Sequence, residues 1–245
     1  MSTKQVLGTI EDFANSAKLA QDAGYDGVEL MGSEGYLINQ FICQRTNQRE
    51  DEWGGEYENR KRFPIEIVKA VRQKVGSDFI IVFRLSMLDL VEEGSTLDEV
   101  IELAKDLEQA GVTIINTGIG WHEARIPTIA TSVPRGAFTW VTELVKPHVT
   151  IPVVTTNRIN NPEQANEVIS SGKADMVSMA RPFLADPEFV IKAQNDQAHL
   201  INTCVGCNQA CLDNAFKGLR ANCMVNPQPA MKQSESSTNP IHRNE

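Results

Sequence analysis

The stretches DAGYDGVE (22–29) and QAGVTIIN (109–116) use one phrase twice: the end of a helix, a glycine and a short apolar run. Gly24 and Gly111 stand where each helix should stop in a left-handed conformation. The residues that follow have the β-branched composition of a strand. A repeated phrase of this kind is typical of βα units around a parallel sheet, so the sequence predicts an α/β fold.

Working outward from this phrase, the chain from about residue 10 to 195 alternates helix-period segments with apolar runs. The predicted strands are Gly24–Leu30, Asp78–Ser86, Val112–Gly118, Ile151–Thr156 and Asp175–Ala180. The predicted helices are Ile10–Asp22, Arg60–Lys74, Leu97–Ala110, Gly136–Val145 and Pro162–Ser171, and Gly76 and Gly172 mark two further helix ends. Five strands do not close an eight-stranded (β/α)8 TIM barrel, so we expect an open arc whose edges invite pairing with another chain.

The composition excludes several classes of function. With 245 residues, 41% hydrophobic and 22% charged, the chain resembles a globular protein with one core. A net charge of −9 without a basic stripe argues against nucleic acid as a partner and favours a small-molecule substrate. Apolar runs such as Phe79–Phe83 are too short to span a membrane, and no signal segment follows Met1, so we expect no membrane partner and a cytoplasmic location.

Four of the five cysteines are clustered as Cys204-x₂-Cys207-x₃-Cys211-x₁₁-Cys223, while Cys43 stands alone. Three close thiolates and a fourth that returns from a helix-like segment, 212–219, make the Cys₄ set that an iron–sulfur cluster requires. Zinc is the main rival, but structural zinc sites favour two separated C-x₂-C pairs, whereas this spacing is a tight triplet plus a distant single cysteine, so the spacing favours iron–sulfur over zinc. Four unrelated buried thiols are the third interpretation.

Polar residues follow the predicted strands, where βα barrels build their active sites. They are Arg84, Asn116, His122, Arg158 and Arg181. A buried arginine at a strand end needs an anionic or carbonyl partner, and a phosphate or a flavin meets that need. The alternative is that a single arginine forms a salt bridge with a neighbouring loop carboxylate.

Tyr36 and His122 are the candidate acid–base pair, because both follow a predicted strand end. A histidine beside the phenol would help a reluctant acid by stabilising the phenolate. Taken singly, each residue has a structural interpretation. Tyr36 lies in the segment 32–59, which is long and rich in polar and aromatic residues, as functional loops are.

Several phrases of the chain are distinctive beyond the general βα pattern. They are GYDGVELMGSEGYLINQF, RTNQREDEWGG, FRLSMLDLVEEG, INTGIGWHEARIPTIA, VTTNRIN, DMVSMARPFLADPE and NTCVGCNQACLDNAF. From about residue 10 to Pro227 the chain resembles the bacterial NADPH-dependent 2,4-dienoyl-CoA reductases, within the old-yellow-enzyme and trimethylamine-dehydrogenase group. The resemblance implies a flavin-dependent oxidoreductase that reduces C=C bonds of 2,4-dienoyl-CoA in fatty-acid β-oxidation.

The resemblance also assigns residues. Tyr36 and His122 match the proton-donating pair of the family. The cofactor residues match as FMN contacts and as residues near the flavin: Arg84, Arg158, Arg181, Pro182, Asn208 and Gln209. The residues that match the acyl-CoA site are Arg45, Thr46, Asn47, Gln48, Glu123, Ala124, Arg125 and Ile126. Cys204, Cys207, Cys211 and Cys223 match the ligands of a [4Fe–4S] cluster.

The resemblance implies a domain order and an electron path. Residues 1–198 are expected to form about the last five βα units of the FMN-binding barrel, 199–227 the cluster segment and 228–245 a disordered polar tail. In the family, NADPH reduces FAD, and single electrons then cross the cluster to FMN. No G-x-G-x-x-G turn is present, so FAD and NADPH are expected only in the full-length family. We expect either an enzyme fragment or, alternatively, an inactive remnant or split subunit whose partner chain supplies the missing strands.

Overall fold

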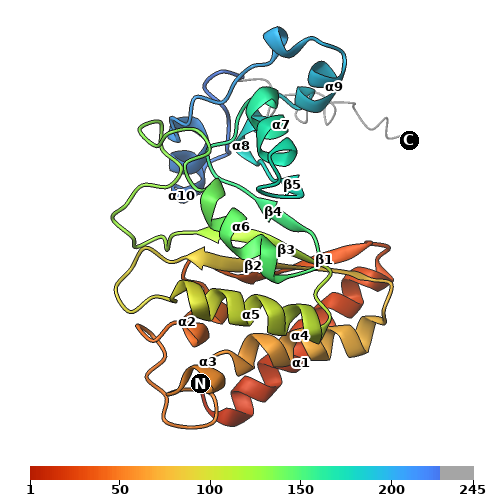
Figure 1. Cartoon of the computed structure of the whole chain (residues 1–245), viewed down its shortest axis with the longest axis vertical. Helices are drawn as coiled ribbons and strands as arrows, with labels where there is room; N and C mark the ends of the chain where they lie inside the picture. The colour runs from red at the N-terminus through yellow and green to blue at the C-terminus, as the bar shows by residue number, and fades with distance from the viewer. Residues whose placement is uncertain (227–245) are drawn as a thin grey trace, which may run out of the picture. The chain divides into compact units, whose positions relative to one another are not determined.

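The computed structural model describes residues 1–226 and divides them into two compact units. The first unit comprises Met1–Thr128, Ala137–Asn157 and Val168–Ser178, and the second comprises Ile129–Gly136, Arg158–Glu167 and the chain from Met179 onward. Figure 1 traces the elements in chain order. The predicted tail and Pro227 lie outside the described residues.

The first unit is built on a parallel sheet in the order β1-β2-β3-β4-β5. Its strands are β1 (Gly27–Gly32), β2 (Ile80–Leu88), β3 (Ile114–Ile119), β4 (Val153–Thr155) and β5 (Met176–Val177). The helices up to β5 are α1 (Thr3–Asp22), α2 (Leu37–Ile42), α3 (Tyr57–Arg60), α4 (Arg62–Val75), α5 (Leu97–Ala110), α6 (Thr139–Val145), the short η1 (Lys146–His148) and α7 (Pro162–Ser170), and α7 belongs to the second unit as far as Glu167. Each strand pairs in parallel with the next one along the chain, so all carboxyl ends lie at one edge of the sheet.

Local sequence signals set the helix ends. Thr96 and Glu99 form a capping box at the start of α5, in which each side chain accepts a hydrogen bond from the backbone N–H of the other residue. Gly111 ends α5 in the left-handed conformation, as the repeated phrase predicts. Gly76 also has a positive φ of 81°, but its ψ of −175° makes it an extended stop rather than a left-handed cap.

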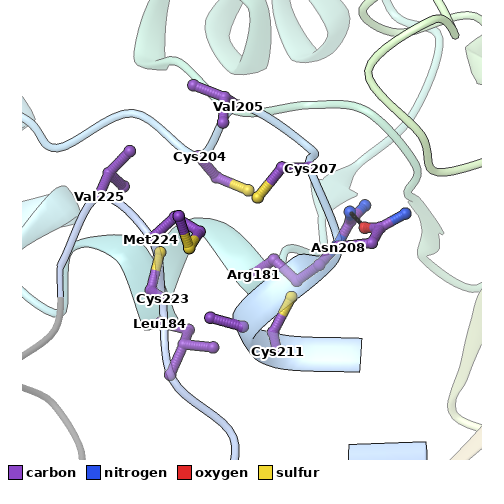
Figure 2. A pocket seen from close by; sticks show the side chains of 11 residues that line it. Arg181, Leu184, Cys204, Val205, Cys207, Asn208, Cys211, Cys223, Met224 and Val225 are labelled. Atoms are coloured by element: carbon purple, nitrogen blue, oxygen red, sulfur yellow. Dashed lines mark hydrogen bonds between the residues drawn. The ribbon is translucent and has the colours of Figure 1, made fainter. Parts of the chain in front are cut away.

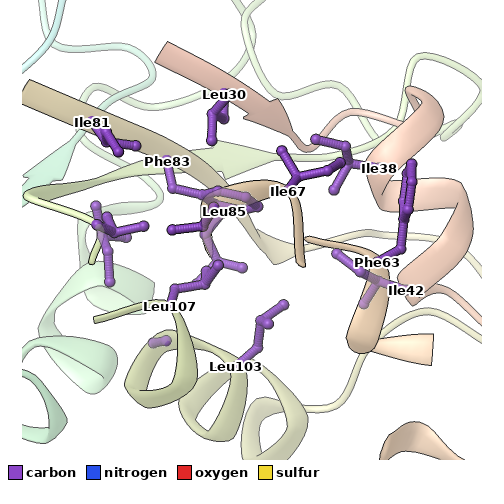
Figure 3. Close-up of a cluster of buried hydrophobic side chains, with 14 of the residues drawn as sticks. Leu30, Ile38, Ile42, Phe63, Ile67, Ile81, Phe83, Leu85, Leu103 and Leu107 are labelled. Carbon is purple, nitrogen blue, oxygen red and sulfur yellow. The ribbon is translucent and has the colours of Figure 1, made fainter. Parts of the chain in front are cut away.

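The core lies where alternate residues of β2 meet α4 and α5. Phe83 and Leu85 are almost fully buried and cluster with Ile67 of α4 and with Leu103 and Leu107 of α5 (Figure 3). Burying a side chain of this size contributes roughly 1.5–3 kcal/mol. The period-2 pattern of the strand and the 3.6-residue pattern of the helices therefore meet in one apolar layer.

The other face of the sheet is different in character. Arg84 and Asn116 are paired in register on it, and Val82 and Ile114 precede them on the same face. Val82, Arg84 and Ile114 are only half-buried. Two of the predicted strand-end residues, Arg84 and Asn116, therefore lie on a face of mixed polar and apolar character, opposite the apolar core face.

The second unit consists of loops and short helices. They are α8 (Arg181–Ala185), α9 (Phe189–Gln194), η2 (Ala198–Leu200), η3 (Gln209–Asp213) and α10 (Asn214–Phe216). The helix-like segment predicted at 212–219 is instead a π-helical turn followed by one α-helical turn.

The predicted α/β fold with a parallel sheet is confirmed, and its closure into a barrel stays a prediction. All five strands form, but they begin one to three residues later than predicted, and β5 has only two residues. The segment 32–59 is not a plain loop, since α2 and α3 form within it. No helix in the described part of the chain has the length and apolar character needed to cross a membrane.

Candidate functional site

Tyr36 and His122 meet at the carboxyl edge of the sheet. Tyr36 is the N-cap residue of α2, just after β1, and His122 follows the end of β3. The Tyr36 Oη lies 3.0 Å from His122 Nε2, and the rings meet edge to face. Both residues are exposed, with Tyr36 at 50%. The structure thus brings the predicted acid–base pair together within reach of solvent and of a ligand.

Arg84 is held by carboxylates in this structure. Its Nη2 lies 2.9 Å from Glu34 Oε1, and its Nη1 lies 3.9 Å from Glu29 Oε1. Asn116 donates a hydrogen bond of 2.7 Å to Glu29. For Arg84 the structure therefore realises the alternative interpretation, a salt bridge with a loop carboxylate, while its predicted contact with FMN stays a prediction.

Arg158 and Arg181 belong to the second unit and have a different environment. Arg158 is buried, and its Nε donates to the carbonyl oxygen of Val133 at 2.9 Å. Burial lowers the pKa of Arg158, the nearby cations Arg181 and Arg135 lower it further, and Cys204 opposes them in part. Among residues 1–226, no carboxylate lies within ion-pair distance of Arg158 or Arg181. A buried, unneutralised guanidinium fits a phosphate ligand, because an anion would offset its desolvation.

Arg181 opens α8 and is followed by Pro182 in the first helical turn. Its Nη1 donates to the carbonyl oxygen of Ile129 at 3.0 Å and to Asn208 Oδ1. Asn208 has a positive φ of 63° and caps the turn that begins at Gln209. Arg181 therefore ties α8 to the middle of the cysteine motif within the second unit.

Four free cysteines, Cys204, Cys207, Cys211 and Cys223, line one pocket of the second unit. Figure 2 shows their sulfur atoms turned toward the same space. The other lining residues are mostly apolar: Leu184, Val205, Ala210, Met224 and Val225. Within residues 1–226 no group of three or more His, Cys, Asp or Glu side chains is placed to hold a metal ion. The structure gathers the four thiols, and the cluster itself stays a prediction.

Hydrogen bonds anchor the loop that carries the first two cysteines. Asn160 Nδ2 donates to the carbonyl oxygen of Cys204 at 2.6 Å, and Thr131 Oγ1 donates to that of Val205 at 2.8 Å. Gly206 has a positive φ of 71°, and a Cβ there would lie 2.7 Å from the Arg158 guanidinium. Asn160 and Thr131 have no signal in the sequence, because both act on backbone carbonyls distant in sequence.

The residues predicted to contact acyl-CoA fall on two loops of the first unit. Arg45, Thr46 and Gln48 are exposed. Asn47 is buried, and its amide donates to the carbonyl oxygens of Phe41 and Trp53. Asn47 therefore stabilises its own loop. In the second loop Glu123, Arg125 and Ile126 are exposed and Ala124 is half-buried, and the substrate role of both loops stays a prediction.

Asp89 is a further residue that the sequence analysis missed. It follows the end of β2, is only 3% exposed and accepts hydrogen bonds from Asn39, Ser86 and Trp121. Its only signal in the sequence is an acidic residue directly after an apolar strand.

Comparison with known proteins places these features in a family. A family model described as the NADH:flavin oxidoreductase / NADH oxidase family matches residues 1–199. The chain is 40% identical over 240 residues to a metal reductase of Desulforamulus reducens, covering 98% of this chain and 36% of that protein. It is 39% identical over 230 residues to an NADH oxidase of Thermoanaerobacter brockii, covering 93% and 35%.

Among solved structures, 2-naphthoyl-CoA reductase in complex with 2-naphthoyl-CoA matches with a TM-score of 0.92 at 35% identity. The match covers 95% of this chain and 36% of that chain. The chain thus spans about a third of the length of these relatives. Since the family model matches most of its length, the chain belongs to the NADH:flavin oxidoreductase / NADH oxidase family, a family of FMN-dependent oxidoreductases.

Proposed function

We propose that this chain is the catalytic part of a flavin- and iron–sulfur-dependent reductase that reduces C=C bonds of 2,4-dienoyl-CoA thioesters in fatty-acid β-oxidation. In a full-length form of the protein NADPH would be the electron donor. The observation that carries the proposal is the 3.0 Å hydrogen bond between Tyr36 and His122 at the carboxyl edge of the sheet. Reduction of an activated C=C bond needs a hydride at one carbon and a proton at the next, and this pair is placed to supply the proton.

FMN fits the residues present. When bound, it supplies the hydride. The buried guanidinium of Arg158, with Arg181, would hold its phosphate, since neither arginine has a carboxylate partner among residues 1–226. Pro182, Asn208 and Gln209 would complete its surroundings in the second unit.

Tyr36 and His122 would have separate roles in the proton transfer. Tyr36 Oη holds the proton that is transferred to substrate carbon. His122 Nε2, at hydrogen-bond distance, stabilises the phenolate that remains and returns a proton to it. The loops Arg45–Gln48 and Glu123–Ile126 would bind and orient the acyl-CoA through their exposed side chains, while the buried Asn47 holds the first loop in shape.

We also propose that Cys204, Cys207, Cys211 and Cys223 hold a [4Fe–4S] cluster. Their shared, mostly apolar pocket supports the assignment, because it places four half-buried thiols, the Cys₄ set of an iron–sulfur cluster, around one space. A bound cluster passes single electrons. Zinc is the competing occupant. Anaerobic reconstitution followed by metal and labile-sulfide analysis should find iron and sulfide in equal amounts, and zinc without sulfide would overturn the assignment.

We propose further that the sheet is an arc of a (β/α)8 barrel. In the described part of the chain β1 and β5 each pair on one side only, and the half-buried face that carries Val82, Arg84 and Ile114 would be the barrel interior. The missing strands would come from a longer form of the protein or from a partner chain.

The proposed substrate class is tested by comparing electron acceptors. One solved relative carries an aromatic CoA thioester and another relative is a metal reductase, so the two electron acceptors to compare are a dienoyl-CoA and ferric iron. The chain is reconstituted with FMN, reduced with dithionite without oxygen, and mixed with 2,4-dienoyl-CoA, a saturated acyl-CoA or ferric citrate. We expect oxidised flavin absorbance to return with the dienoyl-CoA and not with the saturated thioester. Reoxidation by iron alone would show that the proposed substrate class is wrong.

A further inference from the structure

Asp89 is a buried carboxylate without a cationic partner. It lies one residue beyond β2 and is 3% exposed. No Lys, Arg or His of residues 1–226 lies within ion-pair distance of it. Its oxygens instead accept hydrogen bonds from neutral groups, including Ser86 Oγ at 2.6 Å and the backbone N–H of Ser95 at 2.7 Å. Burying a carboxylate without a cation costs free energy, which the hydrogen bonds to Asp89 must offset.

One contact leads to Tyr36. Asn39 Nδ2 donates to Asp89 Oδ1 at 3.2 Å, and Asn39 Oδ1 accepts the backbone N–H of Gly35 at 2.8 Å. Asn39 is fully buried in α2, the helix that Tyr36 caps. The amide of Asn39 therefore fixes the backbone on one side of Tyr36 and is itself fixed by Asp89.

A second contact leads to His122. Trp121 Nε1 donates to the same oxygen, Asp89 Oδ1, at 2.9 Å, and the backbone N–H of Trp121 donates to the Asp89 carbonyl oxygen at 3.0 Å. The side chain and the backbone of Trp121 are thus both held by Asp89. This fixes the residue directly before His122.

Gly35, before Tyr36, and Trp121, before His122, also lie against each other. Gly35 has a φ of +81°, and a Cβ at this position would lie 2.9 Å from the Trp121 indole. The glycine lets the backbone before Tyr36 pack against the ring before His122. The two loops therefore form one assembly around a single carboxylate oxygen.

We propose that Asp89 is a positioning residue that sets the Tyr36–His122 hydrogen bond for the reduction. The inference rests on the proposed function for its effect on rate, whereas its effect on geometry stands independently. Proton transfer requires the two groups at the correct distance and angle, and small displacements of a catalytic group lower the rate steeply.

The geometric test uses the whole chain without flavin. The ring ¹⁵N and ¹H resonances of His122 are recorded by NMR for the wild type and for Tyr36→Phe, which removes the hydrogen bond. We expect Asp89→Asn to move these resonances toward the Tyr36→Phe values. Asp175→Asn is the matched control, because Asp175 accepts the Val153 N–H at the amino end of the sheet. Unchanged His122 resonances in folded Asp89→Asn would overturn the proposal.

A second variant keeps the test decisive if Asp89→Asn does not fold. Trp121→Phe removes the Nε1–H donor and keeps an aromatic ring against Gly35. We expect it to move the His122 resonances in the same direction, and combining it with Asp89→Asn should add less than the sum of the two shifts. Additive shifts or none would contradict a path through Trp121.

The kinetic test uses the FMN-reconstituted, dithionite-reduced chain with 2,4-dienoyl-CoA. We expect Asp89→Asn to lower the maximal rate about ten- to a hundredfold with little change in the substrate concentration for half-maximal rate. In a Tyr36→Phe background the same change should lower the rate no further, whereas an independent further loss would show a merely structural role. If the wild type does not react at all, the proposed function fails, and the NMR result still decides the role of Asp89.

Discussion

At the scale of single residues, the hydrogen bond between Tyr36 and His122 joins positions 86 residues apart. The sequence could nominate both, because each follows a strand in a parallel sheet whose carboxyl ends converge. It offered a salt bridge of a strand-end arginine as an alternative, but it could not foresee that Glu34 is the carboxylate that pairs with Arg84, or that Asp89 links the two loops. Those contacts depend on which polar side chains are buried, and a strand-end residue type does not reveal that.

Cys43 gives a prediction at the same scale. Burial, followed by the nearby carboxylate of Asp89, raises the pKa of the Cys43 thiol from 9.0 to about 12. At pH 9.0 the native chain should therefore leave Cys43 unmodified by iodoacetamide, while the denatured chain reacts at all five cysteines, as peptide mass spectrometry would show. Rapid native alkylation of Cys43 would contradict the burial that underlies this prediction.

The same shift predicts a pH dependence of stability. Because the pKa of Cys43 is raised in the folded chain, its contribution is fully present below pH 9.0 and is lost as the pH rises toward about 12. Cys43→Ala should make the free energy of unfolding less dependent on pH in this interval, measured by urea denaturation. An identical alkaline dependence in the variant would show that other groups govern it.

At the scale of elements, Arg72 of α4 fastens the amino end of the sheet. Its guanidinium donates to the carbonyl oxygens of Gly76, Phe79 and Gly111, which precede β2 and β3. We expect Arg72→Met to lower the free energy of unfolding by about 2 kcal/mol, because several carbonyls lose a charged donor. Arg62→Met on the same helix is the control, since the exposed Arg62 lies over the Trp53 ring and donates to the half-buried Asn59 side chain rather than to the carbonyls before β2 and β3. Equal losses in both variants would contradict this role.

Asp186 fastens the second unit. It is 2% exposed and accepts hydrogen bonds from Lys192 and from the backbone N–H of Asn202, two residues before Cys204. Burial alone would raise the pKa of Asp186, but these donors outweigh it and lower the pKa below 3.8. Its stabilising effect is therefore present above pH 3.8 and is lost as the pH falls through the lowered value.

Hydrogen exchange checks this prediction at the Asn202 amide. Asp186→Asn should weaken the protection of that amide at neutral pH, and acid should weaken it in the wild type. The exposed Asp196→Asn serves as control and should leave the protection unchanged. Protection that survives in Asp186→Asn would contradict the assignment.

The sequence predicted which long helices and strands form more accurately than the residues at which they begin and end. The ends of α5 were predicted to the residue, because the acidic first turn and Gly111 fix them locally. β1 begins at Gly27 rather than at Gly24, because pairing with β2 starts there. The helices α2 and α3 were missed, since they are short and draw their stability from packing on α4 rather than from their own pattern.

At the scale of the whole molecule, the repeated helix-stop-strand phrase correctly predicts a parallel sheet in chain order. It does not predict the two compact units, because Ile129–Gly136 leaves the first unit after β3 and joins the second through contacts such as Thr131 to Val205. Such contacts between distant segments have no local signature. Family membership and fold are thus established, and closure of the barrel, the cluster and the substrate remain proposals.

The most direct test of the central claim compares Tyr36→Phe with Tyr25→Phe. Tyr25 is 68% exposed and lies before β1, away from the carboxyl edge of the sheet. Each variant is loaded with FMN, reduced with dithionite, and mixed with 2,4-dienoyl-CoA under anaerobic conditions. Tyr36→Phe should slow flavin reoxidation about 10²- to 10⁴-fold, the usual contribution of a general acid, while Tyr25→Phe reacts at the wild-type rate. A Tyr36→Phe variant that reacts as fast as the wild type would contradict the assignment of Tyr36 as the proton donor.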